Sequence, residues 1–406
     1  MIKREAYMSQ IRPFIAGDLI KVLTGIRSSG KSVMLELIQE ELLGQGISKS
    51  QFVKLDFENM ENLRLCTAAA LRSEILERAS HIEGKAFIFL DEIQEVEDWE
   101  KCVNSLRVEL DCDIYITGSN AKLLSGELAT YLAGRYVEFA IYPFSFKEFC
   151  EAYALVFPEH DKREVFARYL TLGGMPHLVN LHFQETSARV YLRDLFNSVV
   201  LKDIVKRNKV RDVDLLERII AYVFNSVGTV FSSTSISKFF KNEKRAVAPE
   251  TILNYLGYCV DAFLLTRIKR QDLQGKKLLA VNEKYYVADH GIREAVFGGN
   301  EKEINLVLEN IVCMELIRRG YSVTVGKSGE QEIDFVCEKK GDKLYVQVSY
   351  LLASESTILR EFGAYEKIQD NFPKYVVTLD EFDMSRDGIR HVNIRDFLFR
   401  EEWGYL

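Results

Sequence analysis

Roughly the first 140 residues alternate short apolar runs with amphipathic stretches. Apolar runs bounded by polar residues predict five strands, at 19–23, 51–56, 86–90, 114–117 and 136–141. Apolar residues spaced three and four apart predict helices at 33–43 and 71–79. Strands that alternate with helices are typical of one parallel sheet, so we expect an α/β domain here.

From residue 144 the pattern changes to long helical segments, interrupted by Gly173-Gly174-Met175-Pro176. Residues 215–298 contain two predicted helices, at 235–240 and 249–260, followed by β-like segments at 264–268 and 285–288, an order that suits a winged helix. After Gly298-Gly299-Asn300 the pattern predicts a helix at 304–319 and strands at 322–325, 332–338, 343–350 and 375–378. The chain is therefore predicted to be multidomain.

The turn after the first predicted strand carries a complete GxxxxGK[ST] motif, which ends in Gly30-Lys31-Ser32 and leads into a helix. In this setting backbone N–H groups surround the phosphates of ATP, Lys31 neutralises the outer phosphates and the Ser32 hydroxyl is a ligand of Mg²⁺. The alternative is a glycine-rich turn with an incidental lysine. The residues predicted to contact the nucleotide are Gly25, Ile26, Arg27, Ser28, Ser29, Gly30, Lys31, Ser32 and Val33.

The strand at 86–90 is followed by Asp91 and Glu92, two acids at the strand end where parallel sheets bind their ligands. Asp91 is predicted to hold Mg²⁺ through water, and Glu92 to orient or deprotonate the attacking water. A solvated acid at a helix start is the alternative for Glu92. The strand at 51–56 separates the loop strand from the acid strand in sequence, which favours ATPases with an inserted strand.

Three further polar residues are candidates to sense the γ-phosphate. Asn120 is the first choice and Ser119 the second, because both follow the strand at 114–117, although a turn with a helix cap explains them equally well. Arg135 is a candidate arginine finger for its own or a neighbouring subunit, and a surface arginine is the alternative.

Several motifs together resemble the prokaryotic AAA-type ATPases that carry a C-terminal domain of unknown function. They are the phosphate-binding loop, the segments 90–94, 117–120 and 132–135, and Pro143-Phe144-Ser145-Phe146. The resemblance spans nearly the whole chain and implies an AAA-like sheet with a helical lid. It also implies that Pro176 lies in the lid motif that contacts the base. No clear lid arginine is found, which departs from the family pattern.

The middle region carries clusters of basic residues, among them Lys238, Lys241 and Lys244 between the two helices of the expected winged helix. Such patches can neutralise DNA phosphates, and Thr251 and Asn254, with Tyr255, could face a groove. The alternatives are a solvated face or a protein-binding module.

The last region has the layout of the PD-(D/E)xK nuclease fold, and the family resemblance implies the same relationship. Glu309 lies on a helix and Asp334 on a strand, but the next strand carries Gln347 and Ser349 where the chemistry needs an acid and a lysine. Gln supplies no negative charge and Ser no cation. We therefore expect a restriction-endonuclease-like α/β domain without nuclease activity, or a domain with no nuclease ancestry.

Composition limits the remaining choices. The net charge is −7, so any contact with nucleic acid must be regional. The seven cysteines are scattered without CxxC pairs, and the histidines lack metal-binding spacing. With no signal-like N-terminus and no apolar stretch near 18 residues, the sequence predicts a cytoplasmic protein without a membrane partner.

These observations predict four domains: a P-loop AAA-like ATPase core at 1–143, a helical lid at 144–214, a winged-helix-like domain at 215–298 and a degenerate PD-(D/E)xK-like domain at 299–406. The expected function is hydrolysis of Mg·ATP coupled to a conformational change in the downstream domains. A nucleotide-gated module that binds double-stranded DNA or a protein, with little turnover, and an ATP-dependent nuclease are the alternatives. A homo-oligomer is a further expectation.

Overall fold

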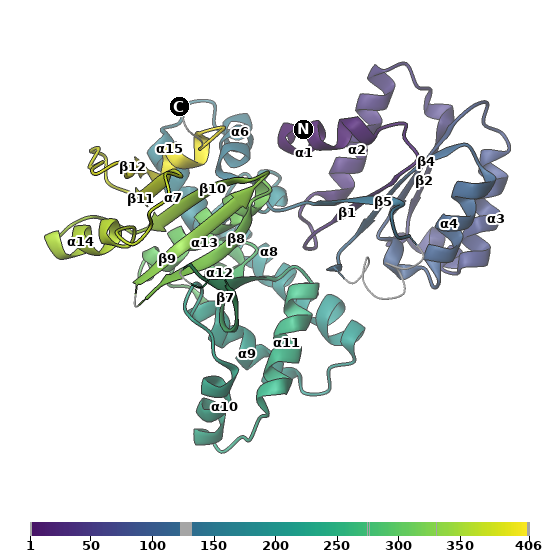
Figure 1. Cartoon of the computed structure of the whole chain (residues 1–406). Helices are drawn as coiled ribbons and strands as arrows, with labels where there is room; N and C mark the ends of the chain where they lie inside the picture. Colours follow the sequence, from purple (N-terminus) through teal and green to yellow (C-terminus); the bar gives the residue numbers. More distant parts are fainter. Residues whose placement is uncertain (1, 122–131, 274, 276, 330, 404–406) are drawn as a thin grey trace. The chain divides into compact units, whose positions relative to one another are not determined.

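The computed structural model describes residues 2–121, 132–273, 275, 277–329 and 331–403. Its contacts divide the chain into two units (Figure 1). Residues 1–142 with 261–263 form the first unit, and residues 143–260 with 264–406 form the second. Among the described residues, no helix combines the length and the apolar character needed to cross a membrane.

The first unit contains one parallel sheet in the order β2-β3-β4-β1-β5. All five predicted strands are present, and β4 lies between β1, which leads into the glycine-rich loop, and β3, which ends at Asp91. The strands are β1 (Ile20–Thr24), β2 (Phe52–Asp56), β3 (Ala86–Asp91), β4 (Cys112–Gly118) and β5 (Tyr136–Ala140).

Both faces of this sheet are buried, which explains why its strands read as continuous apolar runs. Ile88 and Leu90 of β3 pack in one core with α3 and α4, whereas Phe87 and Phe89 pack in a second core with α1 and α2. The helices are α1 (Glu5–Ile11), α2 (Lys31–Gly44), α3 (Ala68–Ala79) and α4 (Trp99–Glu109).

The second unit begins with helices and ends with a mixed sheet. Residues 146–261 form helices, including the π-helical turn η7, and the later strands pair in the order β12-β11-β10-β9-β8-β6-β7. The helices are α6 (Phe146–Val156), α7 (Lys162–Leu172), η6 (Pro176–Val179), α8 (Glu185–Ser198), η7 (Val199–Lys206), α9 (Val213–Asn225), α10 (Ser233–Asn242), α11 (Pro249–Asp261), α12 (His290–Phe297), α13 (Ile304–Arg318), α14 (Glu355–Gly363) and α15 (Ile394–Phe399). The strands are β6 (Leu265–Asp272), β7 (Lys277–Val287), β8 (Ser322–Ser328), β9 (Gln331–Lys339), β10 (Asp342–Val348), β11 (Lys374–Thr378) and β12 (Arg390–Asn393).

The hairpin of β6 and β7, expected as the wing of a winged helix, pairs through β6 with β8 of the C-terminal region. Residues on both sides of the predicted boundary at 298 therefore share one sheet, and the four-domain division stays a prediction. The helices and strands expected for the winged helix are present, but their order alone does not establish that identity.

Candidate nucleotide-binding site

The glycine-rich loop joins β1 to α2 through backbone that only certain residues adopt. Gly25 has φ +143°, and a Cβ there would lie 2.2 Å from the carbonyl oxygen of Ile141. Gly30 has φ +96° and lies at the N-cap of α2. Both positions therefore require glycine. The loop that results ends at the N-terminus of a helix, where unpaired N–H groups and the helix dipole favour an anion.

Lys31 is the first residue of α2, and its side chain lies among acceptors, with only 4% of its surface exposed. Its Nζ donates to the carbonyl oxygens of Gly25 at 3.2 Å and Ile26 at 3.3 Å, and it lies 3.3 Å from Glu92 Oε1. The predicted phosphate-binding lysine and the predicted catalytic acid are thus in direct contact.

Asp91, at the end of β3, is surrounded by hydroxyl groups. Thr117 Oγ1 donates to Asp91 Oδ1, and the Ser32 hydroxyl also bonds to this carboxylate. Burial raises the pKa of Asp91 despite these two bonds, which lower it. Ser32 and Asp91 therefore form a set of hard oxygen donors of the kind that Mg²⁺ prefers.

Glu92 turns away from the strand in a left-handed conformation, with φ +52°. Its N–H donates to Thr117 Oγ1 at 2.8 Å, and Gln94 Nε2 donates to its Oε2. Burial acts to raise the pKa of Glu92, but the charge of Lys31 and the bond from Gln94 lower it overall. Because its pKa is lowered, Glu92 is a carboxylate at neutral pH.

Asn120 and Ser119 follow β4, which lies between β1 and β3. Both side chains are buried, and they lie at the same end of the sheet as the loop and Asp91, where the strands have their carboxyl ends. Parallel sheets bind ligands at this end.

Arg135 lies at the opposite end of the sheet, where the strands begin. It precedes β5, whose Tyr136 pairs with Ile20 at the start of β1, whereas the loop follows the end of β1. The five residues of β1 span about 16 Å. Arg135 is exposed and donates to Asn104 Oδ1 at 2.7 Å. The structure therefore does not bring Arg135 to the loop of its own chain, and its role in a neighbouring subunit stays a prediction.

Pro176 is the first residue of η6, in the second unit. The preceding glycines are tightly enclosed, since a Cβ on Gly174 would lie 2.3 Å from the carbonyl oxygen of Phe144. Asp289 accepts from the N–H of Gly174 at 2.6 Å, so this motif is fixed from within its own unit. The base-contacting role of Pro176 stays a prediction.

Two residues of the site were not predicted from the sequence. Thr117 joins Asp91 to the N–H of Glu92, as described above. Arg4, which precedes α1, is buried and donates to the carbonyl oxygens of Ser29 at 2.9 Å and Tyr142 at 2.7 Å. The position of Thr117 at a strand end gave a usable signal, but nothing in the sequence near Arg4 marks a contact with a loop 25 residues away.

In the middle region, Lys238, Lys241 and Lys244 are exposed. Asn254 on α11 is also exposed, whereas Thr251 and Tyr255 are half-buried. Contact of these residues with DNA stays a prediction.

In the last region, Asp334 and Gln347 lie on the neighbouring strands β9 and β10. The N–H of Asp334 donates to Gln347 Oε1 at 3.1 Å, and Asp334 Oδ2 accepts from the N–H of Val348 at 2.8 Å. Ser349 is buried, and its N–H donates to the carbonyl oxygen of Val377. The sheet backbone thus bonds to the side chains of Gln347 and Asp334, whereas Ser349 is tied to β11 through its own backbone N–H.

Comparisons with known proteins agree with the fold of the first unit. A family profile described as "AAA domain" matches residues 18–150, and one described as a domain of unknown function matches residues 163–303. The sheet and its flanking helices match the P-loop ATPase fold. No finding supports a nuclease relationship for the C-terminal region.

Two relatives are similar over nearly their whole length. An uncharacterized protein of Haemophilus influenzae is 38% identical over 401 residues, which cover 98% of this chain and 99% of the relative. An uncharacterized protein of Methanocaldococcus jannaschii is 28% identical and covers 93% of this chain and 85% of its own length.

Solved structures show more distant similarity. The Aeropyrum pernix ORC1 protein in complex with DNA has a TM-score of 0.30 at 15% identity, covering 74% of this chain and 91% of its own. Thermotoga maritima RuvB has a TM-score of 0.34 at 14% identity, covering 66% and 88%. TM-scores this low do not establish a shared activity.

Proposed function

The chain belongs to the same family as the Haemophilus influenzae protein and contains an AAA domain, and from this premise we propose that it binds Mg·ATP and hydrolyses it. One observation carries the proposal. Lys31 Nζ lies 3.3 Å from Glu92 Oε1, and Thr117 joins Glu92 to Asp91. The lysine that we propose to bind phosphate, the acid that we propose to hold the metal and the acid that we propose to accept a proton thus belong to one linked set of side chains.

In the proposed complex the phosphates take the place of the present partners of Lys31. The ammonium group now contacts two backbone carbonyls and Glu92, and a triphosphate offers it more negative charge than these. The N–H groups at the start of α2 add to phosphate binding. Binding of ATP would therefore release Glu92 from Lys31.

Mg²⁺ fits the donors at the bottom of the loop. Ser32 and Asp91 would hold it, with the hydroxyl of Thr117 orienting the carboxylate of Asp91. When bound, the ion would neutralise charge on the phosphates.

Glu92 would then orient the attacking water and accept its proton. Its lowered pKa keeps it ionised at neutral pH, as a proton acceptor must be. Gln94 would hold the carboxylate through Oε2, leaving Oε1 for the water once Lys31 turns to the phosphates. Asn120 at the neighbouring strand end would contact the γ-phosphate or the water.

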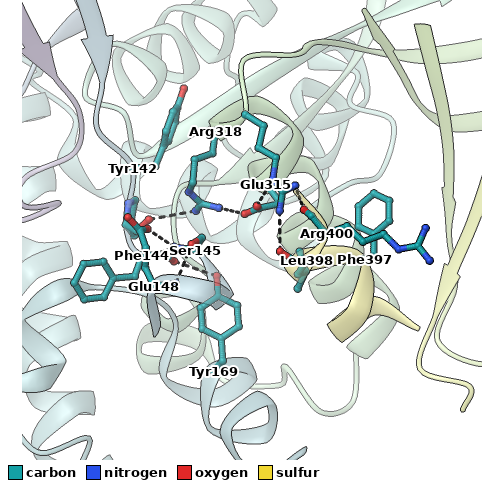
Figure 2. A network of polar contacts seen from close by, with 12 residues as sticks. Tyr142, Phe144, Ser145, Glu148, Tyr169, Glu315, Arg318, Phe397, Leu398 and Arg400 are labelled. Carbon is teal, nitrogen blue, oxygen red and sulfur yellow. Dashed lines mark hydrogen bonds and ion pairs between the residues drawn. The ribbon is translucent and has the colours of Figure 1, made fainter. Parts of the chain in front are cut away.

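Coupling to the second unit is also part of the proposal. Within the first unit, the carbonyl of Ile141 contacts Gly25 and the carbonyl of Tyr142 is bonded to Arg4. The chain then continues directly to Pro143, whose carbonyl accepts from Arg318 Nη2 at 3.2 Å within the second unit. The same arginine is bonded to Glu315 (Figure 2), so residue 143 is tied to the end of α13. We infer that a shift of the loop is passed along residues 141–143.

The test of hydrolysis is steady-state phosphate release with Mg·ATP. Glu92→Gln keeps the shape of the side chain and should lower kcat by about 10²-fold or more while leaving ATP affinity within a few-fold. Glu95→Gln is the matched control, because Glu95 is an exposed acid three residues away. Equal turnover of the Glu92 and Glu95 variants would refute the role of Glu92, and no turnover in the wild type would refute hydrolysis.

A further inference from the structure

Residues 202–250 carry a charge opposite in sign to that of the whole chain. The segment contains ten basic and six acidic side chains, a net charge of +4, whereas the whole chain carries −7. It includes α9 and α10 of the second unit, which lie in the lower part of Figure 1. A local excess of positive charge on an acidic protein indicates a surface for an anionic partner.

Arginines of this segment neutralise several of its acids. Arg245 lies 2.7 Å from Asp212 and also contacts Asp214. Arg218 lies 3.1 Å from Asp214 and 3.5 Å from Glu243. Because Asp212 is the N-cap of α9, these pairs hold the turn after α10 against the start of α9. The charges of these acids are therefore already satisfied within the protein.

The remaining basic side chains of the segment form what we call the basic surface. All seven are exposed, and none makes an ion pair with a residue that the structure describes. Six are lysines, whose flexible point charges suit phosphate oxygens. Glu217 and Glu250 are the acids of the segment that are likewise exposed and unpaired within the described part of the chain. The basic surface consists of Lys202, Lys206, Lys209, Arg211, Lys238, Lys241 and Lys244.

The ion pair of Arg245 with Asp212 brings the two halves of the basic surface together. One half ends at Arg211, directly before Asp212, and the other ends at Lys244, directly before Arg245. Lys209 and Lys244 both have a left-handed backbone, with φ +52° and +62°, in turns that end helices. Glycine is the usual residue at such a position, so both turns carry a cation where the backbone favours glycine.

The helix α11 follows the basic surface in sequence and offers a polar side chain that could contact bases. Burial and then the charge of Asp212 raise the pKa of the Tyr255 hydroxyl, so α11 passes beside the same ion pair. Asn254 of α11 is exposed, and a side-chain amide can bind adenine in the major groove of DNA. That groove admits an α-helix, whereas the major groove of duplex RNA is too narrow. Glu250 in the first turn repels phosphate, so attraction depends on the basic surface.

We propose that the basic surface and the exposed side of α11 bind double-stranded DNA. The lysines would neutralise backbone phosphates, and α11 would lie in the major groove. An acidic protein would be attracted by the same charges, but it offers no groove to a helix and no base edges to Asn254. Binding of DNA does not depend on the proposed nucleotide site, because the two sets of residues share no member.

The test is fluorescence anisotropy of a labelled DNA duplex of mixed sequence, titrated with the full-length chain at about 50 to 200 mM salt. Lys238→Ala/Lys241→Ala/Lys244→Ala should weaken binding about tenfold or more and reduce the slope of log K against log salt by about 2 to 3. Lys206→Ala/Lys209→Ala/Arg211→Ala should act similarly. The matched control, Lys49→Ala/Lys302→Ala/Lys327→Ala, removes three exposed lysines elsewhere and leaves the same net charge, so it should bind as the wild type does.

Competition identifies the kind of anion. Unlabelled duplex DNA should displace the labelled duplex better than duplex RNA or polyglutamate does. A thermal melt confirms that the variants, which change exposed side chains alone, are folded. The proposal is overturned if the wild type does not bind DNA even at the lowest salt, or if the control variant weakens binding as much as the other two. Stronger displacement by RNA or by polyglutamate would also overturn it.

Discussion

Lys31 of the AAA domain and Lys284 of the C-terminal sheet are equally buried but differently bound. Each side chain is 4% exposed, and each ammonium lies within 3.3 Å of a glutamate. Lys31 stands on a glycine-shaped loop, and two of its partners are backbone carbonyls. Lys284 stands on a strand between two side-chain carboxylates that other residues hold in place.

The difference shows what makes a buried lysine available to a ligand. Two of the three partners of Lys31 are neutral carbonyls, which an incoming phosphate outcompetes, whereas Lys284 is paired with two side-chain carboxylates. We therefore expect Lys31 to exchange its present partners for a ligand, and Lys284 to keep its two carboxylate partners. The following predictions test this comparison.

The largest effect is expected for nucleotide binding. Lys31→Ala should weaken ATP affinity and lower kcat/KM by about 10²-fold or more, because it removes the cation that we propose to face the phosphates. Lys284→Ala should change ATP affinity by less than twofold. Fluorescent nucleotide titration of both variants measures the difference, and similar losses in the two would show that Lys284 also serves the nucleotide site.

A large effect on stability is expected for a third buried lysine, Lys21, which is bonded to Asp113 with both side chains 0% exposed. Asp113→Asn would leave the Lys21 ammonium without its counter-charge and should cost about 3–5 kcal/mol of unfolding free energy. The matched control is Asp111→Asn, because Asp111 is 70% exposed in its pair with Lys85. That control should cost about 1 kcal/mol or less.

Urea unfolding of the two variants checks this prediction. Equal losses of unfolding free energy would mean that burial does not set the strength of a lysine pair in this sheet.

A smaller effect concerns pH. The pKa of Glu92 is lowered in the protein without nucleotide, so the wild-type kcat/KM, which reports the free enzyme, should stay constant as pH falls toward the ordinary glutamate pKa of about 4.3 and should decline only below it. Gln94→Ala removes a hydrogen bond that lowers this pKa, so its acid decline should begin at higher pH. The measurement is the profile of kcat/KM between pH 3 and 9. An unchanged acid decline would exclude Gln94 as an orienting partner of Glu92.

The smallest effect is expected at Arg135. Because Arg135 lies at the end of the sheet opposite the loop, Arg135→Gln should leave ATP turnover within twofold when the protein is monomeric. Turnover measured across a range of protein concentrations tests it. A loss that appears only at concentrations where chains associate would assign Arg135 to a neighbouring site.

The sequence predicted well which residues of the proposed nucleotide site lie together where they are close along the chain. Gly25 to Ser32 form one continuous segment, and Asp91 and Glu92 end a strand whose apolar run is unmistakable. The positions of Thr117 and Arg4 depend on which strands lie side by side and on how the chain folds back, so spacing along the chain did not reveal their contacts. The position of Arg135 could not be predicted for the same reason, because a residue that lies next to a strand in sequence can lie at either end of the sheet.

The C-terminal region was harder to predict. The helix and strands after residue 300 were predicted close to their observed bounds, but β12, α12 and α15 were missed. The partner of the acids was missed as well, since Lys284 precedes Glu309 by 25 residues and lies in a segment expected to form a separate domain. An ion pair between residues of two separately predicted domains cannot be recognised from the sequence pattern of either domain alone.

The pairing of β6 with β8 bears on how this protein can be dissected in the laboratory. A fragment that starts at residue 299 would lose two strands and would present the open edge of β8, whose unpaired backbone groups invite other chains to add to it. Such a fragment should aggregate during expression. A fragment that starts at residue 143 keeps the whole sheet and is the better choice for crystallisation.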